Sequence, residues 1–271
     1  MVSFPNAKIN IGLHVIEKRP DGFHNIETIF FPIELKDALE IIISEDTDKN
    51  TFTHSGIHIP GDNSDNLCLK AYHLLKFDFP ELPPVKIHLH KNIPIGAGLG
   101  GGSADGAFTL QMLNTKFNLG LSNSKLMDYA LKLGSDCPFF IENKTSIATS
   151  RGEILEPIAL ELKDYKIVLI NPGIHINTGW AFSNVVPQQK SNSILHIKNI
   201  PIEEWKSSII NDFEIPVFTS FPAIKSIKDE LYQSGAVYAS MSGTGSTVYG
   251  IFEKNCTPKL NFPSSYFLKW V

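Results

Sequence analysis

The densest group of residues suited to chemistry is a glycine-rich stretch, Pro94-Ile95-Gly96-Ala97-Gly98-Leu99-Gly100-Gly101-Gly102-Ser103. It places five glycines in the seven positions from 96 to 102, where an even spread of the 19 glycines over 271 residues would place about half of one. Glycines let backbone N–H groups converge on an anion, and a following helix adds the positive end of its dipole. The stretch therefore predicts a phosphate-binding loop. A flexible hinge or a tight strand-to-helix turn is the simpler alternative.

Two common nucleotide motifs fit this stretch less well. A Walker A motif ends in Gly-Lys followed by Ser or Thr, whereas Gly102-Ser103 is followed here by Ala104-Asp105. The spacing Gly96-x-Gly98-x-x-Gly101 matches a dinucleotide fingerprint. It lies a third of the way into the chain, however, and lacks the acidic residue expected at the end of the next strand.

The elements that must position this loop follow from the spacing of apolar residues. Alternation predicts a strand over 85–90 just before the loop, with Val85, Ile87 and Leu89 on the buried face. Helical spacing predicts a helix over 103–113 just after it, and another over 66–75 that Asp65 or Asn66 caps. Further strands are expected over 5–16, 27–31, 39–44, 147–149, 166–171, 237–242 and 248–252, helices over 123–133 and 222–234, and polar loops over 45–65 and 187–199.

Helices and strands interleave along the whole chain, which is typical of an α/β or α+β protein. The texture changes near residue 158, where apolar strands and strong turn signals begin. A chain of 271 residues fits two modest domains, so we expect an N-terminal domain over 1–157 and a C-terminal domain over 158–271.

Composition excludes several classes of function. Hydrophobic residues make up 42% and charged residues 19%, which supports a folded core and argues against disorder. The net charge of −4 and the lack of a dense Lys/Arg run argue against binding to nucleic acid. No run reaches the ~18 apolar residues of a membrane span, and the first residues lack signal-peptide features, so a cytoplasmic location is expected. The three cysteines, Cys68, Cys137 and Cys256, share no metal-site spacing and are expected to be buried.

Three motifs in order along the chain resemble the kinase family named after galactokinase, homoserine kinase, mevalonate kinase and phosphomevalonate kinase (GHMP). The first is Pro5-Asn6-Ala7-Lys8-Ile9-Asn10-Ile11-Gly12-Leu13, the second is the glycine-rich run over 94–106, and the third is Met241-Ser242-Gly243-Thr244-Gly245-Ser246-Thr247-Val248. The resemblance implies an α+β fold of two domains, an N-terminal ATP-binding and catalytic domain and a C-terminal substrate-side domain, with the active site in the cleft between them.

Within this family, three further segments resemble the kinases of the non-mevalonate route to isoprenoid precursors. They are Arg19-Pro20-Asp21-Gly22-Phe23-His24, Gly134-Ser135-Asp136-Cys137-Pro138-Phe139-Phe140 and Arg151-Gly152-Glu153. The resemblance implies transfer of the γ-phosphate of ATP, with Mg²⁺, to a hydroxyl of a small alcohol that carries a cytidine diphosphate group. It also implies a monomer or weak homodimer with no nucleic-acid or membrane partner.

The resemblance assigns Asp136 as the carboxylate that accepts the proton of the hydroxyl, and Lys8 as its ammonium partner. This pairing suits phosphoryl transfer, which depends on positioning and on stabilising charge. A cap of a turn before Pro138 is the structural alternative for Asp136, and a solvated strand lysine is the alternative for Lys8.

The resemblance also assigns two groups of binding residues. For ATP they are Asn66 and Leu67 beside the adenine, and Pro94, Gly96, Ala97, Gly98, Leu99, Gly100, Gly101, Gly102 and Ser103 around the phosphates. For the substrate they are Asn10, Phe23, His24, Phe182, Ser242, Gly243 and Thr244, with Phe23 stacked on cytosine, Phe182 on its other face and His24 at its edge. Core packing is the alternative for Phe182, and a helix N-cap is the alternative for Ser103. No magnesium ligand is assigned.

The chain departs from the family pattern after the glycines. Ser103-Ala104-Asp105-Gly106 stands where the family usually has two serines and an asparagine. Asp105 would repel a polyphosphate unless it faced a metal ion or solvent, although an acidic residue also suits the first turn of a helix. Phe23 stands where tyrosine is common, and Ser135 stands where alanine is usual.

Two other functions remain open at this point. One is another GHMP kinase that acts on a mevalonate-type or sugar alcohol, against which the 19–24 segment argues. The other is a non-catalytic nucleotide-binding protein, against which the presence of both Lys8 and Asp136 argues.

Overall fold

The computed structural model describes residues 1–45, 49–189 and 194–271 of the chain. The chain forms two compact units, each built from three segments. Unit 1 comprises Met1–Lys8, Pro32–Ile95 and Gly100–Lys144, and unit 2 comprises Ile9–Phe31, Gly96–Leu99 and Thr145–Val271. The domain boundary expected between residues 157 and 158 stays a prediction.

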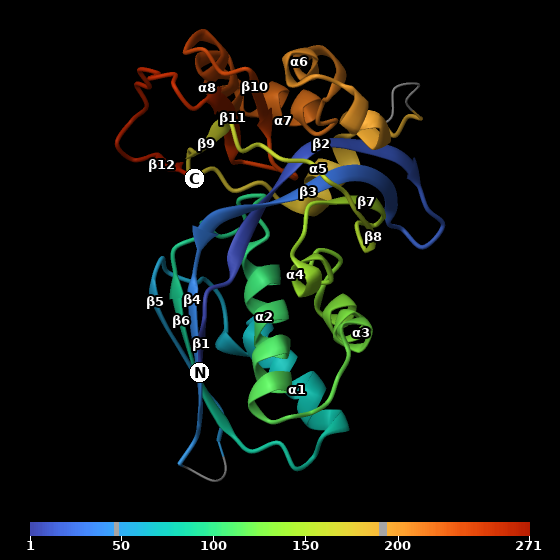
Figure 1. Cartoon of the computed structure of the whole chain (residues 1–271), viewed down its shortest axis with the longest axis vertical. Helices are drawn as coiled ribbons and strands as arrows, with labels where there is room; N and C mark the ends of the chain where they lie inside the picture. The colour runs from blue at the N-terminus through green and yellow to red at the C-terminus, as the bar shows by residue number, and fades with distance from the viewer. Residues whose placement is uncertain (46–48, 190–193) are drawn as a thin grey trace. The chain divides into compact units, whose positions relative to one another are not determined.

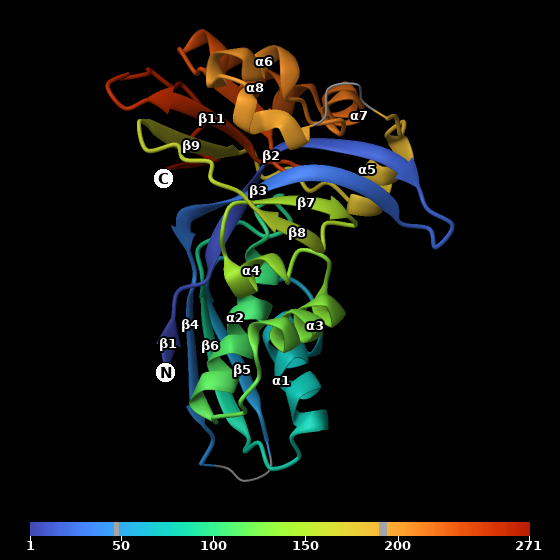
Figure 2. The same ribbon diagram turned by 45° about the vertical axis from the view of Figure 1, so that its right-hand side comes forward.

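Unit 1 packs helices against one face of a four-stranded sheet (Figures 1 and 2). The strand order is β1-β4-β6-β5, with β4 and β6 antiparallel and β5 and β6 parallel. The expected alternation in β6 is confirmed, because Val85, Ile87 and Leu89 are buried. The elements of this unit are β1 (Val2–Ser3), β4 (Ala38–Ile43), β5 (Thr51–Gly56), η1 (Asn63–Asp65), α1 (Leu67–Asp78), β6 (Val85–Lys91), α2 (Gly101–Lys116), α3 (Asn123–Leu133) and α4 (Phe139–Glu142).

Unit 2 contains two sheets, with strand orders β2-β3-β7-β8 and β10-β11-β9-β12. The last long helix, α8, packs against β10 and β11 through Ile224, Ile227 and Leu231, which share one helical face. The elements are β2 (Asn6–Lys18), which begins in unit 1, β3 (His24–Lys36), which ends there, β7 (Ser146–Ser150), β8 (Ile154–Pro157), β9 (Tyr165–Asn171), α5 (Thr178–Asn184), η2 (Ile194–Asn199), η3 (Ile202–Glu204), α6 (Trp205–Ser208), α7 (Glu214–Ser220), α8 (Pro222–Gln233), β10 (Tyr238–Met241), β11 (Val248–Glu253) and β12 (Phe267–Trp270).

Three expectations from the sequence are corrected. The stretch 45–65, expected to be a polar loop, contains β5; its mostly polar residues hide a strand that pairs with β6 along its whole length. The stretch 187–199 includes the 3-10 helix η2, while residues 190–193 lie outside the described residues. Cys68 and Cys137 are buried as expected, but Cys256 is only partly buried.

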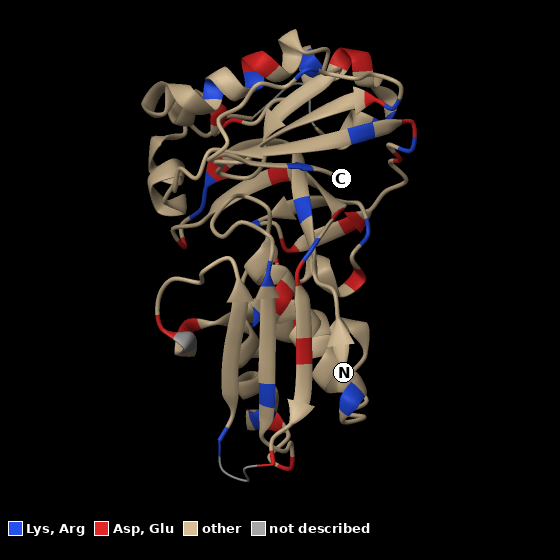
Figure 3. Cartoon of the chain, turned by 90° about the vertical axis from the view of Figure 1, so that its left-hand side faces the viewer, with Lys and Arg blue, Asp and Glu red and all other residues tan. Residues whose placement is uncertain are grey.

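The surface carries charges of both signs. Figure 3 shows Lys and Arg positions interspersed with Asp and Glu positions along the ribbon, in keeping with the modest net charge of −4. Among the helices of the described residues, none has the length and apolar character needed to span a membrane.

Candidate active site

The glycine-rich loop connects β6 to α2. Gly98 and Gly100 have φ angles of 78° and 69°, a left-handed conformation that L side chains rarely adopt. Gly100 is the N-cap of α2, and no side chain of the described residues caps the helix there. The first N–H groups of α2 therefore have the arrangement that binds anions at helix N-termini. The side chains of Ala97 and Leu99 are buried, which leaves glycine backbone between them.

In unit 2, the glycine-rich loop lies against the turn that follows β10. The Ser242 hydroxyl donates to the Gly98 carbonyl at 2.7 Å, and the Thr247 N–H donates to the Ala97 carbonyl at 3.2 Å. A Cβ atom on Gly98 would lie 2.0 Å from the Ser242 carbonyl oxygen, and one on Gly243 would lie 3.3 Å from the Gly98 Cα. The structure therefore joins two motifs, 144 residues apart, that the resemblance assigned to the ATP phosphates and to the substrate.

Asn211 stabilises the turn that follows β10, a role that the sequence analysis does not predict. Its side-chain amide donates to the carbonyls of Met241 and Gly243 at 2.7 and 2.8 Å. Asn211 lies in no recognisable motif, so no sequence signal marks it. Thr244, next to Gly243, lies in the turn itself and is partly buried.

Asn10 is a buried residue of β2 whose amide is engaged within unit 2. Its side-chain N–H donates to the Thr28 hydroxyl at 3.0 Å, and Thr28 in turn donates to the Gly12 carbonyl at 2.6 Å. The Asn10 backbone N–H donates to the Ser242 hydroxyl at 3.1 Å. Asn10 thus links β2 to the Ser242 turn, and the substrate contact expected of it stays a prediction.

Lys8 and Asp136 meet in unit 1, although they are 128 residues apart in the chain. The Lys8 Nζ atom lies 3.2 Å from the Asp136 Oδ2 atom. The lysine side chain is 4% exposed and the aspartate side chain 35% exposed, so the carboxylate remains accessible. A Cβ atom on Gly100 would lie 3.1 Å from Lys8 carbons, which places the lysine stem beside the start of α2.

Ser103 is the third residue of α2, and its expected alternative role as the N-cap is wrong because the helix begins at Gly101. The side chain of Ser103 contacts the thiol of Cys137. Burial raises the pKa of the Cys137 thiol, and a hydrogen bond with Ser103 opposes that shift. This contact joins α2 to the residue that follows Asp136 in the chain.

Asp105 does not face solvent and does not lie in the first turn of α2, which corrects both expectations for it. It is 3% exposed and accepts from the Lys91 Nζ atom at 2.7 Å. Lys91 also pairs with Asp37, whose Oδ1 atom accepts from the backbone N–H groups of Asn92 and Ile93 at 2.6 and 2.8 Å. The carboxyl group of Asp105 therefore ties α2 to the end of β6 through Lys91.

Two carboxyl groups share one ammonium group in this cluster, and the shortage of positive charge affects stability. Burial raises the pKa of the Asp105 carboxyl to about 8, with Asp37 adding to the shift and Lys91 opposing it. In the unfolded chain the group titrates near 4. Between about pH 4 and pH 8 the folded protein holds a proton that the unfolded chain lacks, so this group destabilises the fold increasingly as pH rises.

Asp105→Asn is therefore expected to flatten the pH dependence of stability. Relative to the variant, the wild-type unfolding temperature should fall on the order of 5 °C between pH 5 and pH 8. Thermal unfolding followed by circular dichroism across pH 5–9 measures this difference. Asp128→Asn, which removes an exposed carboxylate, is the matched control and should track the wild type. Parallel curves for wild type and Asp105→Asn would contradict the expectation.

Phe182, expected on one face of cytosine, contacts His24, expected at the edge of the base. The rings of His24 and Phe182 stack directly, with centroids 4.9 Å apart and planes 23° apart. A base between two rings needs roughly 7 Å, so none fits between this pair. Phe182 also packs edge-on against the core residue Phe213. The expected place of Phe182 on the far face of a base stacked on Phe23 stays a prediction.

Phe23 and His24 differ in environment although they are adjacent. Phe23 is 51% exposed, and the Arg151 guanidinium lies over its ring. Burial, with a smaller contribution from Lys18, lowers the pKa of His24. His24 is therefore neutral at pH 7 and offers one donor and one acceptor, the pair needed to bind a base edge.

Asn66 and Leu67 begin α1. Asn66 caps the helix by accepting from the Cys68 N–H at 2.9 Å, which settles the expected choice between Asp65 and Asn66. The Leu67 Cβ atom lies 3.1 Å from where a Cβ on Gly106 would be, so α1 approaches α2 closely here. Helix capping and helix packing account for both residues, and their contact with adenine stays a prediction. Among the described residues no group of three or more His, Cys, Asp or Glu could hold a metal ion.

Comparison with known proteins shows the family of the chain. A family model described as "GHMP kinases N terminal domain" matches residues 66–144, and one described as "GHMP kinases C terminal" matches residues 202–255. The chain belongs to the GHMP kinase family. This confirms the family and the α+β fold expected from the motifs, and with them a phosphotransferase.

Relatives that match nearly the whole chain carry a more specific name. The 4-diphosphocytidyl-2-C-methyl-D-erythritol kinase of Bacteroides fragilis is 51% identical over 269 residues, which cover 98% of this chain and 97% of the relative. The same kinase of Cytophaga hutchinsonii is 53% identical over 93% of this chain and 92% of the relative. A crystal structure of 4-(cytidine 5'-diphospho)-2C-methyl-D-erythritol kinase superposes with a TM-score of 0.79 at 30% identity, and the match covers 93% of this chain and 90% of that one.

Proposed function

We propose that the chain transfers the γ-phosphate of ATP to the 2-hydroxyl of 4-diphosphocytidyl-2-C-methyl-D-erythritol, in the non-mevalonate route to isoprenoid precursors. The observation that carries this proposal is the contact between buried Lys8 and accessible Asp136 beside the start of α2. The names of relatives that share half of its residues over nearly the full chain support the choice of substrate.

Asp136 and Lys8 perform complementary tasks in this reaction. The Asp136 carboxylate accepts the proton of the attacking hydroxyl, and the Lys8 ammonium stabilises the negative charge that develops on the oxygen. Burial of the lysine removes competing water and fixes its position. Phosphoryl transfer depends mainly on such positioning and charge stabilisation, which these two side chains provide at the hydroxyl.

The clamp for ATP is the glycine-rich loop. Backbone N–H groups at the uncapped start of α2 bind the phosphates, and Ser103 adds a hydroxyl. Mg²⁺ fits this site because it binds mainly through nucleotide phosphates and water, with one or two protein oxygens. The Ser103 hydroxyl would supply such an oxygen, whereas Asp105 is engaged by Lys91. When bound, Mg²⁺ neutralises charge on the transferring phosphate.

The substrate contacts lie in unit 2. Neutral His24 binds the edge of cytosine, and the exposed ring of Phe23 stacks on its face. Phe182 holds the His24 ring, and the turn with Ser242, Gly243 and Thr244 contacts the rest of the substrate together with Asn10. The proposed enzyme acts in the cytoplasm on small molecules alone, as a monomer or weak homodimer.

A substrate panel tests the proposal. ADP release by the purified protein with Mg²⁺ and ATP is measured with the cytidine diphosphate alcohol, and separately with mevalonate, galactose and homoserine. Release with the cytidine compound alone is expected. Turnover of another alcohol instead would move the protein elsewhere in the family, and ATP binding without any release would favour a non-catalytic nucleotide-binding protein.

A further inference from the structure

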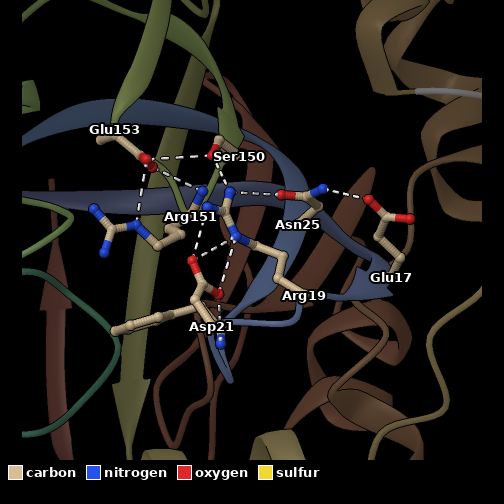
Figure 4. Close-up of polar contacts among 8 residues, drawn as sticks. Glu17, Arg19, Asp21, Asn25, Ser150, Arg151 and Glu153 are labelled. Atoms are coloured by element: carbon tan, nitrogen blue, oxygen red, sulfur yellow. Dashed lines mark hydrogen bonds and ion pairs between the residues drawn. The ribbon is translucent and has the colours of Figure 1, made fainter.

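A polar network joins two turns of unit 2 at one end of the sheet that contains β3 and β7 (Figure 4). The first turn, residues 19–23, connects β2 to β3, and the second, residues 150–153, connects β7 to β8. The two turns are neighbours because Ile26 on β3 pairs with Ser150 on β7.

Arg19 provides the links between the turns. Its guanidinium donates to Asp21 at 2.8 Å and to the Asn25 side chain at 3.1 Å, both near its own turn. It also donates to the Ser150 hydroxyl at 2.9 Å, and Ser150 donates onward to Glu153 at 3.2 Å. The carboxylate of Glu153 is thereby held in place by the neighbouring turn (Figure 4).

Glu153 in turn fixes Arg151. Its carboxylate accepts from the Arg151 backbone N–H at 2.7 Å and from the Arg151 Nε atom at 3.3 Å. With its inner end held, the guanidinium of Arg151 lies over the Phe23 ring, 4.8 Å from the centroid. The side chain of Arg151 is 27% exposed, so solvent weakens this cation–π contact without removing it.

The Phe23 ring depends on the contact with Arg151 because few other groups pack against it. The ring is 51% exposed, and its backbone is held by a hydrogen bond from its N–H to Asp21 at 3.1 Å. An exposed phenyl ring loses rotamer freedom when it stacks on a ligand, and that loss weakens binding. A cation held over one face reduces the loss beforehand and leaves the opposite face for a ligand.

We infer that Arg151 is a positioning residue that holds the Phe23 ring ready to stack on the pyrimidine base of the substrate, and that Arg19, Ser150 and Glu153 hold Arg151 in place for this task. This inference rests on the proposed function, in which Phe23 stacks on cytosine. Arg151 acts through Phe23 and takes no part in the chemical step.

A double-mutant cycle of Arg151→Met and Phe23→Ala tests the inference. Arg151→Met is expected to raise the KM for the cytidine compound about fivefold, with kcat and the KM for ATP unchanged. Arg151→Lys, which keeps a cation, should stay within about twofold of wild type. In a Phe23→Ala background, Arg151→Met should have no further effect. Lys163→Met, which removes an exposed cation elsewhere in unit 2, controls for long-range attraction of the diphosphate and should change nothing.

Several outcomes would overturn the inference. They are an unchanged KM in Arg151→Met, a fivefold effect that persists in the Phe23→Ala background, or a loss of kcat with a lower unfolding temperature in both Arg151 variants. Calorimetric binding of cytidine 5'-diphosphate separates this inference from the proposed reaction. If the wild type fails to phosphorylate the cytidine compound but binds the nucleotide with the same dependence on Arg151 and Phe23, the reaction is wrong and the inference stands.

Discussion

Asp136→Asn is expected to lower kcat by about 10²- to 10⁴-fold while ATP binds as tightly as in the wild type. Asparagine keeps the shape of the side chain but accepts no proton, and it carries no charge to pair with Lys8 at 3.2 Å. Asparagine keeps a side-chain oxygen that can accept a hydrogen bond from the buried Lys8 ammonium, and position 136 is 35% exposed, so the fold should persist. Turnover is measured as ADP release and ATP affinity by calorimetry.

Asp128→Asn is the matched control for this experiment, since it changes an exposed aspartate of α3 that pairs only loosely with Lys125. It should leave kcat and ATP affinity unchanged. Full activity in Asp136→Asn would contradict a catalytic role for the carboxylate. Loss of ATP binding with retained folding would show instead that Asp136 serves the nucleotide.

Gly98→Ala is expected to destabilise the protein by at least about 2 kcal/mol and to remove activity with it. The φ angle of 78° disfavours any L side chain, and the new Cβ would lie 2.0 Å from the backbone oxygen of Ser242. Backbone cannot rotate away as a flexible side chain can, so the loop and the Ser242 turn must separate. The unfolding temperature should fall by about 4 °C or more.

Gly102→Ala provides the control within the same loop. A Cβ atom there meets nothing within 4 Å, and the residue lies in the first turn of α2. Alanine favours the helix, so the unfolding temperature should stay the same or rise slightly. Equal unfolding temperatures for the two variants would contradict the close approach of the loop to Ser242.

The sequence predicts much of the scaffold because local patterns suffice for it. The strand over 85–90 shows its buried face by alternation, and the helices over 123–133 and 222–234 show theirs by spacing and flanking turn residues. β5 escapes prediction because its sequence Thr-Phe-Thr-His-Ser-Gly lacks apolar alternation, and its pairing with β6 determines its structure.

The residues of the candidate site also fall into two groups, those that sequence motifs indicate and those that depend on tertiary packing. Lys8 and Asp136 are predicted only through the resemblance of their separate motifs, since nothing local brings together residues so far apart in the chain. Asp105 is misread because an aspartate after glycines resembles a surface residue until Lys91 and Asp37 are seen beside it. The contact of His24 with Phe182 and the support by Asn211 depend on tertiary packing and leave no mark on the sequence.

The most direct test of the proposed function is to follow the transfer of the γ-phosphate from ATP to the substrate. The wild-type protein is incubated with Mg²⁺, ATP and 4-diphosphocytidyl-2-C-methyl-D-erythritol, and the phosphorus NMR spectrum is recorded over time. The account predicts a new phosphomonoester resonance on the 2-position of the erythritol, formed in equal amount with ADP, while the two diphosphate resonances of the substrate persist. Release of inorganic phosphate without that resonance, or an unchanged spectrum, would contradict the proposed kinase.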